Sequence, residues 1–160
     1  AYGNFVNRSL VFIQKYLNNK VPEARCNQNI IQSVAKLYPC IGGLIDQGNF
    51  KEALDTIFSL VRSANKYFDE EQPWITIKSD VEKCKETMNT CVQIIANLSN
   101  LLEPFLPFSS AKVRNILKIE KATWQCIEIP SGLELGKVEI LFERIDKKVI
   151  REEEEKLKGY

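Results

Sequence analysis

The stretch 64-ANKYFDEEQPW-74 ends in two adjoining residues that are an unusual pair at the expected start of a helix. Pro73 suits the first helical position, where it fixes the backbone just before the next side chain. That side chain, Trp74, is one of two tryptophans in the chain, and its indole offers a broad apolar surface with one N–H donor. Trp74 also precedes Ile77 by three residues, a spacing that by itself favours packing in the core.

A second pair of polar residues opens the chain, on the side of the first expected helix that lies opposite its apolar face. Asn4 and Arg8 are four residues apart, so a helix places them one turn apart on the same side. Arginine presents a planar fork of donors, and asparagine presents both a donor and an acceptor. Taken singly, Arg8 is typical of a solvated surface arginine, and Asn4 of a polar residue near a helix end.

The sequence contains no arrangement of residues that predicts a catalytic or metal site. Histidine, the commonest general base and metal ligand, is absent. A glycine-rich phosphate loop, H-E-x-x-H and G-x-S-x-G are absent as well. The five cysteines are odd in number and lack C-x-x-C spacing, which argues against a disulfide framework or a zinc site. We therefore expect no catalytic residues, no metal ligands and no cofactor in this chain.

Size, charge and cysteine usage limit the class of protein further. A chain of 160 residues favours one domain with a substantial core. The formal net charge of +1 is weak for a nucleic-acid binder, so any such contact must be local and specific. Free thiols indicate a reducing compartment, which we expect to be the cytoplasm. A membrane-spanning run and a signal peptide are not expected, and the early helical pattern after Ala1 indicates a piece of a longer chain.

Apolar residues recur at helical spacing through most of the chain. They predict five amphipathic helices, over residues 2–18, 23–47, 50–69, 73–102 and 111–119. Short joints between these segments, and no strong strand signal before residue 120, indicate an all-α fold in which the helices form an antiparallel bundle.

Local signals predict where these helices begin and break. Pro22 suits the start of the second helix, and Pro39 is expected to kink or split it. The stretch 103-EPFLPFSS-110 breaks the long fourth pattern with two prolines, and Ser109 or Ser110 is expected to cap the last bundle helix.

The texture of the sequence changes after residue 119. Residues 124–146 contain Pro, Gly and short apolar runs and are expected to form an irregular or β-like extension. Residues 147–160 are expected to form a charged terminal helix. The sequence therefore predicts two parts, a helix bundle over 1–119 and a C-terminal extension with its helix over 120–160.

Four stretches in this order carry a family resemblance. They are 3-GNFVNR-8, 64-ANKYFDEEQPW-74, 101-LLEPFLPFSSAKVRNIL-117 and 138-VEILFERID-146. Together they resemble the anticodon-binding domain of class I aminoacyl-tRNA synthetases, and within that group the methionyl-tRNA synthetase family. The first and third stretches recur among the related synthetases for leucine, isoleucine, valine and cysteine, whereas the second and fourth are specific to the methionine family. The resemblance covers essentially the whole chain.

The resemblance implies a role for each of the four polar and aromatic residues singled out above. In that family, the Pro-Trp joint and the first bundle helix bind the tRNA anticodon. Pro73 and Trp74 match the proline and the tryptophan that stacks on an anticodon base. Asn4 and Arg8 match the asparagine and arginine that bond to base edges. The implied partner is a methionine tRNA with a CAU anticodon.

The resemblance also implies what this chain lacks. In the family, methionine is activated with ATP and joined to tRNA by a separate catalytic domain, which carries HIGH-like and KMSKS-like signatures and zinc-binding cysteines. None of these is present here. We therefore expect the chain to act with a catalytic domain and to read tRNA identity without performing the ligation.

Two other interpretations stay open at this point. The chain could be the same module from a neighbouring class I synthetase, which a preference for a different anticodon would establish. It could also be a helical protein-interaction module with no role in RNA binding. The near-neutral charge supports this interpretation mildly, and failure to bind any tRNA at low salt would favour it.

Overall fold

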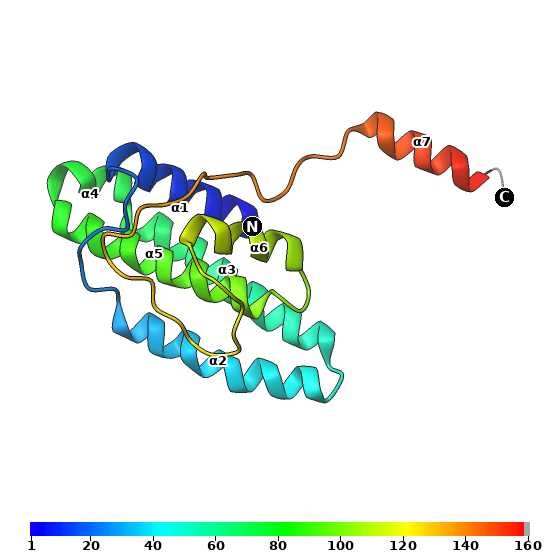
Figure 1. Cartoon of the computed structure of the whole chain (residues 1–160), viewed down its shortest axis with the longest axis horizontal. Helices are drawn as coiled ribbons and strands as arrows, with labels where there is room; N and C mark the ends of the chain where they lie inside the picture. The colour runs from blue at the N-terminus through cyan, green and yellow to red at the C-terminus, as the bar shows by residue number, and fades with distance from the viewer. Residues whose placement is uncertain (159–160) are drawn as a thin grey trace.

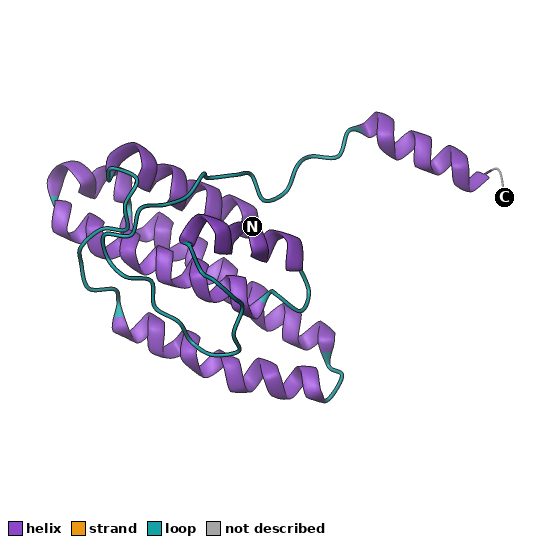
Figure 2. Ribbon diagram, in the orientation of Figure 1, coloured by secondary structure: helices purple, strands orange, loops and turns teal. Residues whose placement is uncertain are grey.

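The computed structural model describes residues 1–158 and contains seven α-helices in that range. They are α1 (Tyr2–Tyr16), α2 (Gln28–Asp46), α3 (Phe50–Glu71), α4 (Pro73–Ser79), α5 (Val81–Leu101), α6 (Pro107–Leu117) and α7 (Lys147–Lys158). Helices α1 to α6 form a bundle, and α7 projects away from it (Figures 1 and 2). Within the described residues the fold is all-α, as predicted, and its one β-bridge pairs Lys20 with Glu134.

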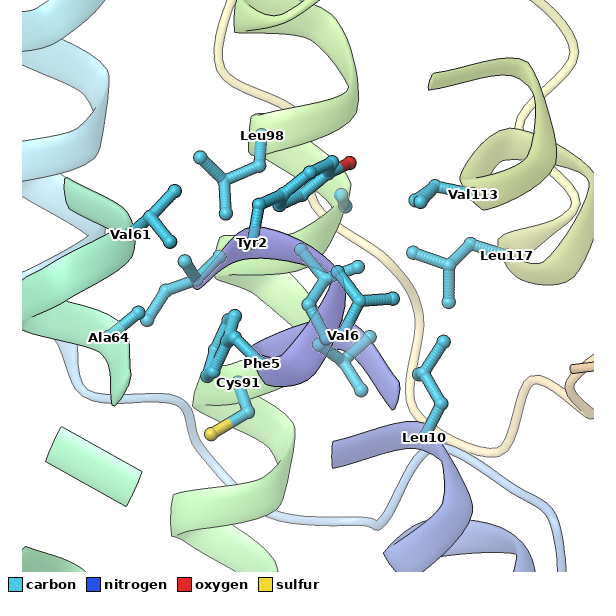
Figure 3. Close-up of a cluster of buried hydrophobic side chains, with 14 of the residues drawn as sticks. Tyr2, Phe5, Val6, Leu10, Val61, Ala64, Cys91, Leu98, Val113 and Leu117 are labelled. Atoms are coloured by element: carbon cyan, nitrogen blue, oxygen red, sulfur yellow. The ribbon is translucent and has the colours of Figure 1, made fainter. Parts of the chain in front are cut away.

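Helix α5 is the centre of the bundle. It contacts α1, α2, α3, α4 and α6, and every residue from Thr87 to Leu101 is buried. The apolar face of α1 supplies Phe5, Val6 and Leu10 to the core beside α5 (Figure 3). Burial of this many aliphatic and aromatic side chains, at about 1.5–3 kcal/mol each, is what holds the bundle together.

Helix α2 begins later than predicted. The start near Pro22 is wrong, because residues 21–27 follow a non-helical course whose ends bond to the C-terminal extension and to side chains of α5. The amide of Val21 donates to the carbonyl of Leu133, and the carbonyl of Val21 accepts from Gly132. Asn27 caps the helix instead, with its side chain accepting from two backbone amides of the first turn.

Pro39 does not split α2, in contrast to one of the two expected outcomes. The helix runs from Gln28 to Asp46 with Pro39 inside it. Because Pro39 lies on the exposed side, water can bind the helix carbonyl that the missing N–H leaves free.

The long fourth pattern is two helices, so the prediction of one helix over 73–102 is wrong. Asp80 ends α4 with an extended backbone, and its side chain accepts from the amide of Lys83 as the N-cap of α5. The apolar spacing continues across this break, which is why periodicity alone did not reveal it.

The start of α6 also differs from the prediction. Leu106 is the N-cap and Pro107 the first residue of the helix, so neither Ser109 nor Ser110 caps it. The hydroxyl of Ser109 donates back to the carbonyl of Leu106, and Ser110 is buried in the core. Pro107 at the first helical position is the more reliable signal here.

The extension after α6 runs along the bundle without forming a strand within the described residues. Side-chain amides of α5 hold it; we call these four residues the carboxamide seam: Asn89, Gln93, Asn97 and Asn100. The side chain of Asn97 accepts from the amide of Ile127 and donates to its carbonyl, both at 2.9 Å.

Gln93 repeats this pairing two residues further along the extension. It accepts from the amide of Ile129 at 2.7 Å and donates to its carbonyl at 2.9 Å. Alternate residues of the extension therefore bond to α5 much as a strand bonds to its neighbour. The prediction of an irregular extension is confirmed, and its partner is a helix.

The terminal helix was predicted over 147–160, of which residues 159–160 lie outside the described part. As described, α7 has no buried residue. No described helix is both long enough and apolar enough to cross a membrane.

Candidate nucleic-acid interface

The joint between α3 and α4 is a sharp change of direction at Gln72. This residue has φ 46° and ψ 60°, the left-handed conformation, and it ends α3 while starting α4. Its amide donates to the carbonyl of Phe68, and its carbonyl accepts from Ile75 and Thr76. The same residue therefore closes one helix and opens the next, which fixes the direction in which α4 leaves.

Pro73 and Trp74 follow this turn with opposite exposures. Pro73 is buried as the first residue of α4, and its carbonyl accepts from the thiol of Cys84 at 3.6 Å. Trp74 is 43% exposed. The core packing that its spacing from Ile77 favours is therefore not observed, because Pro73 takes the buried position.

The indole of Trp74 lies against the last turn of α3. Its ring centroid is 6.0 Å from that of Phe68, with the two planes tilted by 39°. Phe68 is 3% exposed and belongs to the core. Trp74 thus packs against a buried core residue, Phe68, while about two-fifths of its surface is open to solvent.

Arg8 reaches the same place from α1. Its guanidinium carbon is 4.3 Å from the centroid of the Phe68 ring, within the range of a cation–π contact. It also donates to the carboxylate of Asp69 at 2.6 Å. The Arg8 side chain is 28% exposed, so part of its fork of donors is open to solvent. We call these five residues the aromatic corner: Arg8, Phe68, Asp69, Pro73 and Trp74.

Asn4 is exposed on α1, one turn before Arg8 and about 6 Å from it along the helix axis. It borders a surface hollow whose lining includes Asn7, Ile140 and Phe142. Three of the four predicted site residues therefore meet at the aromatic corner, and Asn4 lies beside it on the same helix.

The charges around the corner are largely compensated. Asp69 pairs with Arg8, and Glu71 pairs with Lys83 at 2.8 Å. The hydrogen bond to Glu71 raises the pKa of Lys83, so this amine is cationic at neutral pH. Burial raises the pKa of the Cys91 thiol to about 12, although the nearby charge of Arg8 acts in the opposite direction. A corner with this balance attracts anions weakly over distance and must act through contact.

The arrangement suits recognition of flat, unpaired groups. It offers a partly exposed indole and a guanidinium that share one supporting ring, with the Asn4 amide one turn from Arg8 on α1. The sequence pattern had singled out neither Phe68 nor Asp69 as a site residue. Their position directly before the joint was the available signal. Among residues 1–158, no cluster of three or more His, Cys, Asp or Glu side chains could hold a metal ion.

Comparisons with known proteins agree on one family. Residues 20–160 match the family model described as the anticodon-binding domain of methionyl tRNA ligase. Methionine–tRNA ligase 1 of Alkaliphilus oremlandii is 46% identical over 157 residues, which are 98% of this chain and 29% of that protein. Methionine–tRNA ligase 2 of Bacillus cereus is 52% identical over 160 residues, again 29% of its length. The chain thus spans under a third of these relatives.

Solved structures agree at the level of the fold. The apo form of Mycobacterium tuberculosis methionyl-tRNA synthetase superposes with a TM-score of 0.80 over 89% of this chain and 31% of that one, at 24% identity. The same enzyme bound by methionyl-adenylate gives a TM-score of 0.80 over 88% of this chain and 30% of that one, at 23% identity. At this identity the likeness concerns the architecture of the bundle.

Proposed function

Because the chain belongs to the family of anticodon-binding domains of methionyl-tRNA ligases, we propose that it binds the anticodon loop of a methionine tRNA. The contact consists of Asn4, Arg8, Pro73 and Trp74. The relevant triplet is CAU, the anticodon that the resemblance to the methionine family implies.

The observation that carries this proposal is the aromatic corner. Its two recognition groups, Arg8 on α1 and Trp74 on α4, are more than sixty residues apart in sequence, and both contact Phe68. Trp74 is 43% exposed even though it has a core beside it. An exposed indole next to a partly open guanidinium is what a reader of single-stranded bases requires.

Each group has a distinct task in the proposed complex. A base splayed out of the loop stacks on Trp74, an interaction worth about 1–3 kcal/mol. Pro73 fixes the backbone before the indole, so that less freedom is lost on binding. Arg8 and Asn4 bond to base edges, where arginine offers parallel donors and asparagine a donor and an acceptor.

The ligation reaction belongs, in this proposal, to the part of the relatives' length that this chain does not span. A catalytic domain there joins methionine to the tRNA with ATP, and any zinc belongs to that domain. The present chain recognises the tRNA on behalf of a cytoplasmic enzyme.

The test is binding of the 160-residue chain to two anticodon stem-loops that differ in the triplet alone, CAU against a scrambled triplet, at one fixed low salt concentration. We expect clear preference for CAU. Arg8→Ala should then weaken binding of the CAU loop by about 1–3 kcal/mol and narrow the preference. An equal loss for both loops would mean that Arg8 touches phosphates.

Two other results would replace the proposal. Preference for another triplet would assign the chain to a neighbouring class I synthetase. No binding to either loop at low salt, where phosphate contacts are strongest, would favour a protein-interaction module. The two-loop comparison should then be repeated with a catalytic domain attached. Preference for CAU in that longer protein would show that discrimination between triplets needs the whole enzyme, and continued lack of binding would show that the chain does not read the anticodon.

A further inference from the structure

Phe68 contacts two residues that the proposed function uses. The guanidinium of Arg8 lies 4.3 Å from the centre of its ring, and the indole of Trp74 lies 6.0 Å away. Arg8 comes from α1 and Trp74 from α4, so their shared contact is made by tertiary packing through α3.

The Phe68 ring is held firmly by its surroundings. It is 3% exposed and packs in the hydrophobic core. Its carbonyl accepts from the amide of Gln72 at 3.3 Å, the bond that precedes the left-handed turn into α4. The ring and the joint that aims Trp74 therefore keep a fixed relation to each other.

Asp69 and Pro73 restrain Arg8 and Trp74 only in part. Asp69 binds one nitrogen of Arg8 and restrains its edge, which does not by itself fix the guanidinium plane. Pro73 fixes the backbone before Trp74, which leaves the side-chain angles of the indole free. A buried aromatic face restrains both, because a cation is attracted to the face and aromatic pairs prefer tilted or offset contact.

We propose that Phe68 is a positioning residue for anticodon recognition, a role that presupposes the function proposed above. Its ring holds the Arg8 guanidinium and the Trp74 indole in place before the loop arrives. Long arginine side chains have many rotamers, so a preset guanidinium loses less freedom when it bonds to a base edge. Phe68 touches neither base nor phosphate in this role.

The test substitution is Phe68→Leu, which keeps an apolar side chain of similar size and removes the aromatic face. Without the aromatic face, the Arg8 and Trp74 side chains must be ordered when the loop binds, and this added cost predicts about ten-fold weaker binding of the CAU stem-loop. Acrylamide quenching of tryptophan fluorescence measures how accessible the Trp74 indole is to a small molecule in solution. In a Trp124→Phe background, where Trp74 is the remaining tryptophan, Phe68→Leu should raise the quenching rate.

The matched control is Phe58→Leu, the same substitution on the same helix. Phe58 lies ten residues earlier on α3, about 15 Å along the axis, and packs against the core. It should leave both the CAU affinity and the quenching of Trp74 unchanged. Affinities are compared at a temperature at which circular dichroism shows that both variants are folded.

A double variant adds a readout that general destabilisation would not produce. If Phe68 acts through Trp74, Phe68→Leu should weaken binding clearly less than ten-fold when Trp74→Ala is already present. A full ten-fold loss in that background would mean that the effect does not pass through the indole, and would overturn the positioning role for Trp74.

Two further outcomes overturn the role of Phe68. One is wild-type affinity and quenching in Phe68→Leu; the other is an equal loss of affinity in Phe58→Leu. In both cases the wild-type chain still prefers CAU, so the proposed function survives. Absence of that preference in the wild type is a different result, which removes the function and leaves nothing for Phe68 to position.

Discussion

The carboxamide seam of α5 and the aromatic corner at Gln72 both carry side chains with several hydrogen-bonding groups, but they differ in how far those groups are already used. In the seam, Asn97 bonds to the amide and carbonyl of Ile127 and accepts from the hydroxyl of Tyr38 at 2.8 Å. At the corner, Trp74 is 43% exposed and Arg8 keeps part of its fork open.

This difference separates stability from recognition within one bundle. A buried amide that is fully bonded rigidifies its surroundings, and removal of one partner leaves others unsatisfied at a cost. An exposed indole or guanidinium contributes little to folding and keeps its interactions for a ligand. Substitutions in the seam should therefore lower the free energy of unfolding, and substitutions at the corner should lower the affinity for the anticodon loop.

The largest effect is expected for Asn97→Ala. It removes the side-chain partners of the amide and carbonyl of half-buried Ile127 and the short-range acceptor of the Tyr38 hydroxyl, which keeps only its longer bonds to the Asn97 carbonyl and the Asn100 amide. The fold should be destabilised by about 3 kcal/mol. For a chain of this size the melting temperature should fall by about 10 °C. Urea unfolding followed by circular dichroism measures the change.

The control for the seam is Gln125→Ala, an exposed side chain in the same extension whose backbone carbonyl still accepts from Asn100. Its stability should stay within about 0.5 kcal/mol of the wild type. Asn97→Ala should bind the CAU loop normally wherever it is folded. If Asn97→Ala lost affinity for the loop without losing stability, the proposed division between a stabilising seam and a binding corner would be wrong.

The next effect is expected for Trp74→Ala. It should weaken binding of the CAU loop by about 1–3 kcal/mol, the value of one base stacked on an aromatic ring. Since the indole is 43% exposed, stability should fall less than for Asn97→Ala, by about 1–2 kcal/mol. Fluorescence anisotropy of a labelled stem-loop measures the affinity.

The second tryptophan provides a matched control. Trp124 is 40% exposed, close to Trp74, but its indole N–H donates to the carbonyl of Tyr38 at 3.0 Å. Trp124→Ala should therefore lower stability and leave loop binding intact. If Trp124→Ala weakened loop binding and Trp74→Ala did not, the stacking residue would be Trp124.

A smaller effect is expected for Asn4→Ala. One hydrogen bond to a base edge contributes about 0.5–1.5 kcal/mol net, and the loss should be confined to the CAU loop. Asn115→Ala, an exposed asparagine on α6, serves as the control and should bind both loops as the wild type does. An equal loss for both loops would show that Asn4 contributes no base reading.

Much of the bundle was predictable from the sequence because its helices have regular apolar faces and strong stop signals. Asn18 and Asn19 adopt the left-handed conformation after α1, as their residue type allows. The break at Asp80 was missed because the apolar spacing runs through it, although an aspartate that can cap a helix is itself a local signal.

The contacts that define the two regions were less accessible. The seam has a trace in the sequence, since Asn89, Gln93 and Asn97 are spaced by four residues on a helix buried on all sides. The meeting of Arg8 with Phe68 has no such trace, because it depends on how α1 packs against α3. The roles of Asn4, Arg8, Pro73 and Trp74 came from the family resemblance and stay predictions.

The smallest effect on folding, and the sharpest test of the corner, is expected for Asp69→Asn. The ion pair with Arg8 is exposed on its acidic side, where 57% of the Asp69 side chain is accessible, so its loss should change stability by about 0.2–1 kcal/mol. Binding should respond differently, because the charge of Arg8 is no longer compensated. Both loops should bind more tightly, the preference for CAU should narrow, and affinity should depend more steeply on salt.

Asp55→Asn is the matched control, because Asp55 pairs with Lys51 at 2.7 Å on the same helix, far from the corner. It should alter stability as slightly and leave both affinities and their salt dependence unchanged. If Asp69→Asn also leaves them unchanged, the guanidinium of Arg8 does not face the bound loop. The corner would then be a structural contact like the seam, and the distinction between the two regions would fail at Arg8.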